Sequence, residues 1–256
     1  MFRFFPIAGY LTPNAKGAVG ESVRPMLHDG GEGWSFIVPD IPERGAGYRP
    51  LVLETDRGKV ACRYYAAQGA SKGVVWVGGT GGGWDTPARG LYPDLAKALM
   101  EDGISSLRVR FRMSTRLREC VSDVQAGLLY MANEGISIVG LVGHSFGGAV
   151  VIRTAASSSM ARTVVALAPS SSGSVHPSEL GPHCSLLLAH GTADDVVPSS
   201  CSESIHHLAG EPKELALFPG AGHSLDEAAA EVRELVRTWL RTRLAPGQGQ
   251  LLGCVE

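Results

Sequence analysis

The stretch "GLVGHSFGGAV" (residues 140–150) joins a buried-strand pattern over 136–143 to a helical pattern over 146–158. Ser145 stands at the junction, inside a glycine-x-serine-x-glycine pattern whose two glycines leave room for a crowded backbone. A sharp strand-to-helix turn of this kind lifts the serine side chain above the carboxyl edge of a sheet. The following helix points its first amide groups at the serine, and its dipole favours negative charge there. We therefore predict that Ser145 is a nucleophile; the alternative is a serine that only caps a glycine-rich helix start.

The same five-residue pattern occurs a second time, at "GASKG" (69–73), so the pattern alone does not identify a nucleophile. Ser71 lies in a polar turn that leads into the strand pattern "GVVWVG" (73–78). We expect Ser71 to be solvated, because the arrangement of strand, turn and helix that exposes a nucleophile is found only around Ser145.

Apolar strand patterns and helical patterns alternate along most of the chain. The expected strands cover residues 51–55, 59–65, 73–78, 104–111, 136–143, 162–169, 184–191 and 213–220. The expected helices cover 91–103, 115–135, 146–158, 199–210 and a last segment from a capping box at Ser224 and Glu227 to about residue 244. The strand runs lack strict alternation, which is typical of strands buried on both faces. The sequence predicts an α/β fold, a doubly wound and mostly parallel sheet with helices on both faces.

The chain divides into three expected parts. Residues 1–50 contain many glycines and prolines and little periodicity, which predicts an irregular N-terminal arm. Its lack of acidic residues before Glu21 is compatible with a weak targeting segment. Residues 51–244 contain no linker and are expected to form one domain, and residues 245–256 are expected to form a polar tail.

Composition excludes several classes of partner. With 23 Lys and Arg against 25 Asp and Glu, the net charge of −2 gives no electrostatic reason to expect nucleic acid. No apolar run approaches the roughly 20 residues that span a bilayer, so no transmembrane segment is expected. The five cysteines form no C-x-x-C pair, which argues against a zinc site or a disulfide framework. We expect a cytoplasmic protein, with a plastid or mitochondrion as the alternative, and the oligomeric state stays open.

A serine nucleophile needs a base, and the base needs an acid to hold its tautomer. His223 lies in "FPGAGHSLDE" (218–227), after one expected strand and before the last helix; the alternative is a polar residue that only precedes a helix. "AHGTADDVVP" (189–198) supplies Asp194 and Asp195 after another strand. Because the carboxyl ends of parallel strands share one edge of a sheet, we expect these side chains to converge on Ser145.

The glycine loop "GGTGGG" (78–83) follows a strand and would let backbone amides approach a developing negative oxygen. The expected donors are the amide of Phe146 and an amide at Gly79 or Thr80. A phosphate-binding loop is the rival interpretation, but the Lys-Ser/Thr ending of a P-loop is missing. The other alternative is a flexible turn.

With these segments, the chain resembles the α/β-hydrolase superfamily, in particular its serine esterases without a cap and its dienelactone-hydrolase-like members. The resemblance is carried by "GGTGGG", "GHSFG", "GTADDVVP" and "GAGHS", and it covers roughly residues 51–243. It implies catalytic roles for Ser145, Asp194 and His223, and no metal or organic cofactor. Relatives often carry a lid where this chain has the short polar segment 170–183, so we expect no sizeable lid and an open site, with His176 and Leu180 at its rim.

The expected function is hydrolysis of small or accessible carboxylic esters or thioesters through an acyl-enzyme on Ser145. One alternative is a non-catalytic binding or interaction protein on the same scaffold, because a fold alone does not specify an activity. Another is an acyltransferase or peptidase that uses the same triad. Four apolar residues are candidates either for the pocket or for core packing: Trp84, Phe111, Met113 and Phe146.

Overall fold

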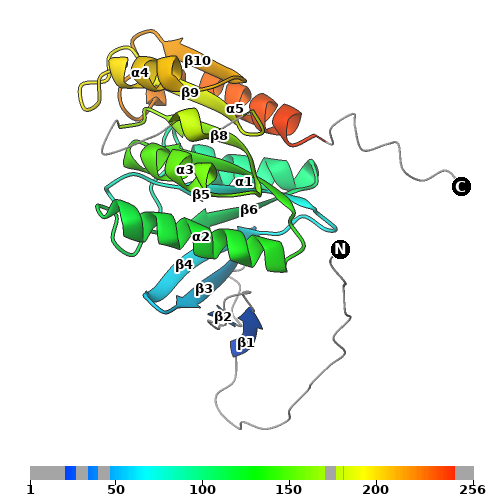
Figure 1. Cartoon of the computed structure of the whole chain (residues 1–256). Helices are drawn as coiled ribbons and strands as arrows, with labels where there is room; N and C mark the ends of the chain where they lie inside the picture. The colour runs from blue at the N-terminus through cyan, green and yellow to red at the C-terminus, as the bar shows by residue number, and fades with distance from the viewer. Residues whose placement is uncertain (1–20, 27–33, 40–46, 171–176, 181, 246–256) are drawn as a thin grey trace, which may run out of the picture.

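The computed structural model of the 256-residue chain describes residues 21–26, 34–39, 47–170, 177–180 and 182–245 (Figure 1). Within them, ten strands form one sheet in the order β1-β2-β3-β4-β6-β5-β7-β8-β9-β10. The strands are β1 (Glu21–Met26), β2 (Trp34–Pro39), β3 (Arg49–Thr55), β4 (Gly58–Tyr65), β5 (Lys72–Val77), β6 (Ile104–Val109), β7 (Ile138–His144), β8 (Ala161–Leu167), β9 (Ser185–Gly191) and β10 (Lys213–Phe218). The helices are α1 (Leu91–Glu101), α2 (Leu117–Asn133), α3 (Phe146–Ala156), α4 (Ser200–Leu208) and α5 (Ala229–Arg243).

The sheet is parallel where the site is built and antiparallel at its N-terminal edge. Strands β5 to β10 pair in parallel with one another, whereas β1 to β4 pair antiparallel, as do β4 and β6. The chain winds from β5 to β6 on one side and then continues with β7 on the other. In sheets of this kind, the crevice beyond the carboxyl ends of such central strands is where ligands bind.

The two faces of the sheet carry separate cores, as successive side chains on β5 demonstrate. Val75 and Val77 pack in the layer that contains residues of α2 and α3. Val74 and Trp76 pack in the opposite layer, with residues of α1 and α5. Because successive side chains of β5 point to opposite faces and both faces are covered, every position of the strand from Val74 to Val77 is apolar. The predicted doubly wound sheet with helices on both faces is confirmed (Figure 1).

The N-terminal region differs from the irregular arm expected over residues 1–50. Strands β1 and β2 extend the sheet there, and β2 pairs antiparallel with β3. The prolines and glycines near these strands obscured the pattern, while the backbone partners that stabilise β2 come from β3, the next strand along the chain. Residues 1–20 and 246–256 lie outside the described residues, and the three-part division of the chain stays a prediction.

The last helix begins later than the sequence indicates. Leu225 adopts a left-handed φ of 58°, a short 3-10 turn η2 covers Asp226–Ala228, and α5 starts only at Ala229. The carboxylate of Glu227 accepts a hydrogen bond from the amide of Gly222 at 3.0 Å instead of completing a capping box with Ser224. The expected cap was therefore wrong, because the loop that carries His223 uses that carboxylate.

The connection between β8 and β9 carries no sizeable lid in its described part, in agreement with the sequence. Its one regular element there is the 3-10 turn η1 (Pro177–Leu180). Leu180 is buried in the core beneath α3 rather than at the rim of the site, and His176 lies outside the described residues. Among the helices of the described ranges, none combines the length and the apolar character needed to cross a membrane.

Candidate active site

Ser145 lies on the sharp turn between β7 and α3. Its backbone adopts φ 55° and ψ −121°, a conformation that is uncommon for a residue other than glycine. The Ser145 amide donates to the carbonyl of Leu167 on β8 at 2.8 Å, and the Ser145 carbonyl accepts from the amide of Gly148 at 3.0 Å. These contacts hold the strained turn, as is common where a side chain is presented for chemistry.

Glycines around this turn are required by close backbone contacts. A β-carbon at Gly143 would lie 2.2 Å from the carbonyl oxygen of Gly147. A β-carbon at Gly147 would lie 2.3 Å from the carbonyl oxygen of Gly78, at the end of β5. The glycine loop therefore packs directly against the turn, and the position of a β-carbon on Gly79 is 3.3 Å from the Ser145 β-carbon.

Asp194 and His223 meet beyond the ends of β9 and β10. The Nδ1 atom of His223 donates to Oδ2 of Asp194 at 2.7 Å. The other carboxylate oxygen accepts from the amides of Val196 at 2.9 Å and Val197 at 2.8 Å. Burial raises the pKa of Asp194, but the hydrogen bonds from Val197, His223 and Val196 outweigh it, and the net pKa is lowered. Asp194 therefore stays ionised beside the imidazole, whereas Asp195 is exposed.

His190 provides a further contact to Asp194 that sequence reasoning missed. Its Nε2 atom donates to Asp194 Oδ2 at 3.0 Å and to the carbonyl of Val197 at 2.9 Å. Because a carbonyl can only accept, this network places a proton on Nε2, while Nδ1 is hydrogen-bonded to the Ser202 hydroxyl at 2.7 Å. His190 and Ser202 are both fully buried. The signal was present in the sequence as a histidine at the end of an apolar strand, four residues before the acid.

His144 connects the serine turn to the loop of His223. Its Nε2 atom donates to the backbone carbonyl of His223 at 2.9 Å, and the two rings lie 4.8 Å apart. Burial lowers the pKa of His144 to about 4, so the ring is neutral near pH 7. A neutral ring here fixes the base loop without adding a positive charge beside it.

One pocket of about 400 Å³ is lined by four of the predicted site residues, Gly79, Thr80, Ser145 and His223, whereas Asp194 and Phe146 do not line it. Its lining residues are Gly79, Thr80, Gly81, Asp85, Thr86, Pro87, His144, Ser145, Val196, His223 and Ser224. This volume lies in the range of small-molecule sites. None of the four apolar candidates belongs to this set. Phe111 and Phe146 pack in the core, and Arg63 stacks on the ring of Trp84.

The sequence profile described as the dienelactone hydrolase family matches residues 89–238, more than half of the chain. The chain belongs to the dienelactone hydrolase family. Family membership identifies it as a hydrolase, and hence an enzyme, that acts on a small-molecule substrate. Among curated proteins, none matches this sequence.

Solved structures share the fold of this dienelactone hydrolase family member at low sequence identity. Est1E from Butyrivibrio proteoclasticus has a TM-score of 0.65 and 16% identity over 77% of this chain and 99% of its own. A dienelactone hydrolase from Anabaena variabilis has a TM-score of 0.64 and 19% identity, over 77% of this chain and 98% of its own. An α/β serine hydrolase without a lid from Xanthomonas campestris has a TM-score of 0.64 and 20% identity, over 80% of this chain and 99% of its own. These similarities establish an α/β-hydrolase fold.

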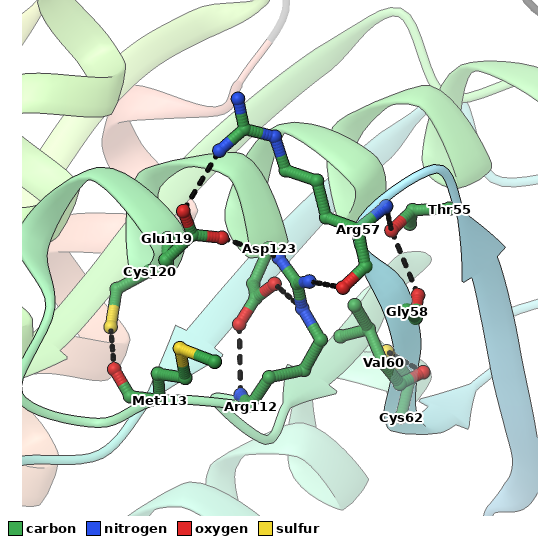
Figure 2. Close-up of polar contacts among 10 residues, drawn as sticks. All are labelled: Thr55, Arg57, Gly58, Val60, Cys62, Arg112, Met113, Glu119, Cys120 and Asp123. Carbon is green, nitrogen blue, oxygen red and sulfur yellow. Dashed lines mark hydrogen bonds and ion pairs between the residues drawn. The ribbon is translucent and has the colours of Figure 1, made fainter.

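The loop before α2, which contains Ser114, is hydrogen-bonded to the glycine loop of this family member. The Ser114 hydroxyl donates to the carbonyl of Thr80 at 2.8 Å. Figure 2 shows how the segment preceding α2 is fixed: the backbone amide and Nε of Arg112 donate to the two oxygens of Asp123 at 2.9 and 2.5 Å. The Asp123 side chain is fully buried. Neither residue stands out in the sequence, because the contact joins a loop to a helix face.

Proposed function

We propose that this enzyme is a serine hydrolase that cleaves small or accessible carboxylic esters or thioesters through an acyl-enzyme on Ser145. One observation carries the proposal: the imidazole of His223 shares a pocket with Ser145 and donates to the buried Asp194 carboxylate at 2.7 Å. A histidine held in this tautomer presents its Nε2 lone pair as a base, and the carboxylate stabilises the imidazolium that forms.

In the first half-reaction, Ser145 Oγ attacks the acyl carbonyl carbon while His223 Nε2 takes the hydroxyl proton. The tetrahedral intermediate collapses, the bond to the leaving alcohol or thiol breaks, and His223 returns the proton to that group. In the second half-reaction, a water molecule gives a proton to His223 and attacks the acyl-enzyme. Collapse then releases the carboxylic acid and restores the Ser145 hydroxyl with the proton from His223.

The negative oxygen of each intermediate is stabilised by the amide of Phe146 and an amide of the glycine loop. Gly79 and Thr80 both line the pocket beside Ser145, so either amide is a candidate for the second donor. Loss of one such donor typically lowers turnover by about 10²–10³-fold. The short connection between β8 and β9 supports a preference for small or accessible substrates.

The test is steady-state hydrolysis of short p-nitrophenyl esters, a thioester and an anilide by the wild type, Ser145→Ala and Ser71→Ala. We expect ester and thioester turnover, its loss by about 10³-fold or more in Ser145→Ala, and unchanged rates in Ser71→Ala. The second variant is a matched control, because Ser71 occupies the other glycine-x-serine-x-glycine pattern. Full activity in Ser145→Ala, or turnover of the anilide alone, would contradict the proposal.

A further inference from the structure

The pocket contains one carboxylate that the proposed mechanism does not use. Asp85 follows the glycine loop and lines the same pocket as Ser145 and His223. Among the described residues that line it, Asp85 is the sole acidic side chain, and no lysine or arginine contributes. A substrate in this pocket therefore meets a single carboxylate, on an exposed side chain, with no cationic side chain opposite it among the lining residues.

The backbone around Asp85 is fixed at both neighbouring residues. The carbonyl of Trp84 accepts from the buried guanidinium of Arg108 at 2.7 Å. On the other side, the Thr86 hydroxyl accepts from the amide of Tyr92, in the first turn of α1, at 2.9 Å. Asp85 is thus held between two anchored residues, so its position is a property of the fold rather than of a loose loop.

The glycine loop makes room for this carboxylate. A β-carbon at Gly81 would lie 2.4 Å from Oδ2 of Asp85, so the glycine leaves the carboxylate its observed rotamer beside the loop. A β-carbon at Gly78 would meet the β-carbon of Asp85 at 3.4 Å. Within the described part of the chain, no hydrogen bond or ion pair reaches the carboxylate. Arg63 and Arg108 stack on the ring of the neighbouring Trp84.

The field of Asp85 reaches the residue next to the nucleophile. Although burial dominates the low pKa of His144, the charge of Asp85 acts on that ring in the raising direction. A carboxylate so close to the site repels the oxyanion that forms on any ester, and a positive group on the substrate would offset that repulsion. Two unit charges about 6 Å apart, at an effective dielectric constant of about 40, change an equilibrium roughly tenfold.

We propose that Asp85 determines the specificity of the pocket, so that it favours esters with a quaternary ammonium or protonated amine over isosteric neutral esters and disfavours those with a carboxylate. The inference rests on the proposed esterase function, and it specifies which substrate charge that esterase prefers.

The experiment compares pairs of esters of equal shape. One pair is acetylcholine and the acetate in which a tert-butyl group replaces the trimethylammonium group. A second set is p-nitrophenyl esters of one acyl chain that ends in trimethylammonium, tert-butyl or carboxylate. For each pair, the ratio of kcat/KM values is measured in the wild type, Asp85→Asn and Asp56→Asn, at low and high salt. The ratio within one preparation does not depend on the fraction of folded enzyme.

We expect a cationic-to-neutral ratio of about 10 in the wild type for at least one of the two placements of the charge, and an anionic-to-neutral ratio below 1. In Asp85→Asn both ratios should approach 1, and high salt should reduce them in the wild type. Asp56→Asn removes the same charge from the exposed turn between β3 and β4 and should keep the wild-type ratios.

Three results would overturn the inference. Hydrolysis of the neutral esters with ratios near 1 in the wild type would contradict the role of Asp85 and leave the esterase function intact. Ratios that persist in Asp85→Asn would assign the selectivity to another group. If the wild type hydrolyses none of the esters, the proposed function fails, and the inference fails with it.

Discussion

At the residue scale, the Asp194 carboxylate determines how the imidazole of His223 is held. Each of its oxygens accepts two hydrogen bonds: two amides reach Oδ1, and two imidazoles reach Oδ2. A carboxylate has about four acceptor positions, so this one is saturated and has a single orientation. We therefore propose that His190 is a positioning residue, which orients Asp194 and through it the imidazole of His223.

Substitution of His190 tests that role. His190→Leu leaves Ser202 and the Val197 carbonyl without their partner, so we expect a loss of about 1–3 kcal/mol in the free energy of unfolding. Because the acid is then less firmly placed, kcat should fall by roughly 10-fold or more while KM changes little. His190→Gln keeps an N–H donor near the Nε2 position and should recover most of kcat. If Gln and Leu lower kcat equally, His190 only fills space.

The buried His144 predicts how stability depends on pH. Its pKa is about 4 in the folded chain and near 6.5 when unfolded, so the unfolded state binds more protons between these values. The contribution of the neutral His144 ring to the free energy of unfolding is fully present above about pH 6.5 and is lost as the pH falls toward 4. In thermal unfolding, the difference in Tm between the wild type and His144→Gln should shrink over that range. A constant difference between pH 7 and pH 4 would contradict a neutral, buried ring.

At the scale of elements, the end of β5 and the start of α3 approach each other closely at Gly147. Gly147 lies against the Gly78 carbonyl, and Gly148 lies against Pro169, where a β-carbon would be 2.8 Å from the proline β-carbon. These approaches bring the glycine loop to the serine turn. The spacing between nucleophile and oxyanion donors is therefore set by the absence of side chains.

The variant Gly147→Ala tests this contact. Its β-carbon would meet the Gly78 carbonyl oxygen at 2.3 Å, so the two elements must separate, at a cost of about 1–3 kcal/mol in the free energy of unfolding. We expect ester turnover to fall at least 10²-fold, because the donors move away from the developing oxyanion. Gly210→Ala is the control, since nothing lies within 4 Å of its β-carbon position. Wild-type turnover in Gly147→Ala would show that the close approach is not needed.

At the scale of the whole molecule, the sequence was most informative where structure is local. The buried runs and glycine-ended helices predicted β5 to β10 and the helices between them, because their periodicity is contained in consecutive residues. The turn at Ser145 was predictable for the same reason. The parallel sheet then required the segments of Asp194 and His223 to end at one edge.

The features that sequence analysis missed depend on particular contacts rather than on periodicity. Strand β2 pairs with β3 and β1 pairs with β2, within a region whose prolines and glycines hide the strand pattern. The start of α5 is displaced because Glu227 binds the Gly222 amide. The place of Asp85 in the pocket follows from the path of the loop after β5, which no periodicity reveals.

The most direct test of the proposed chemistry is covalent labelling with a fluorophosphonate, followed by mass spectrometry of the digested protein. We predict a single adduct on the peptide that contains Ser145, present in the wild type and in Ser71→Ala, and absent in Ser145→Ala. Labelling should also slow by a large factor in His223→Ala, because the serine loses its base. A folded wild-type protein that forms no adduct, or forms it at another serine, would contradict the account.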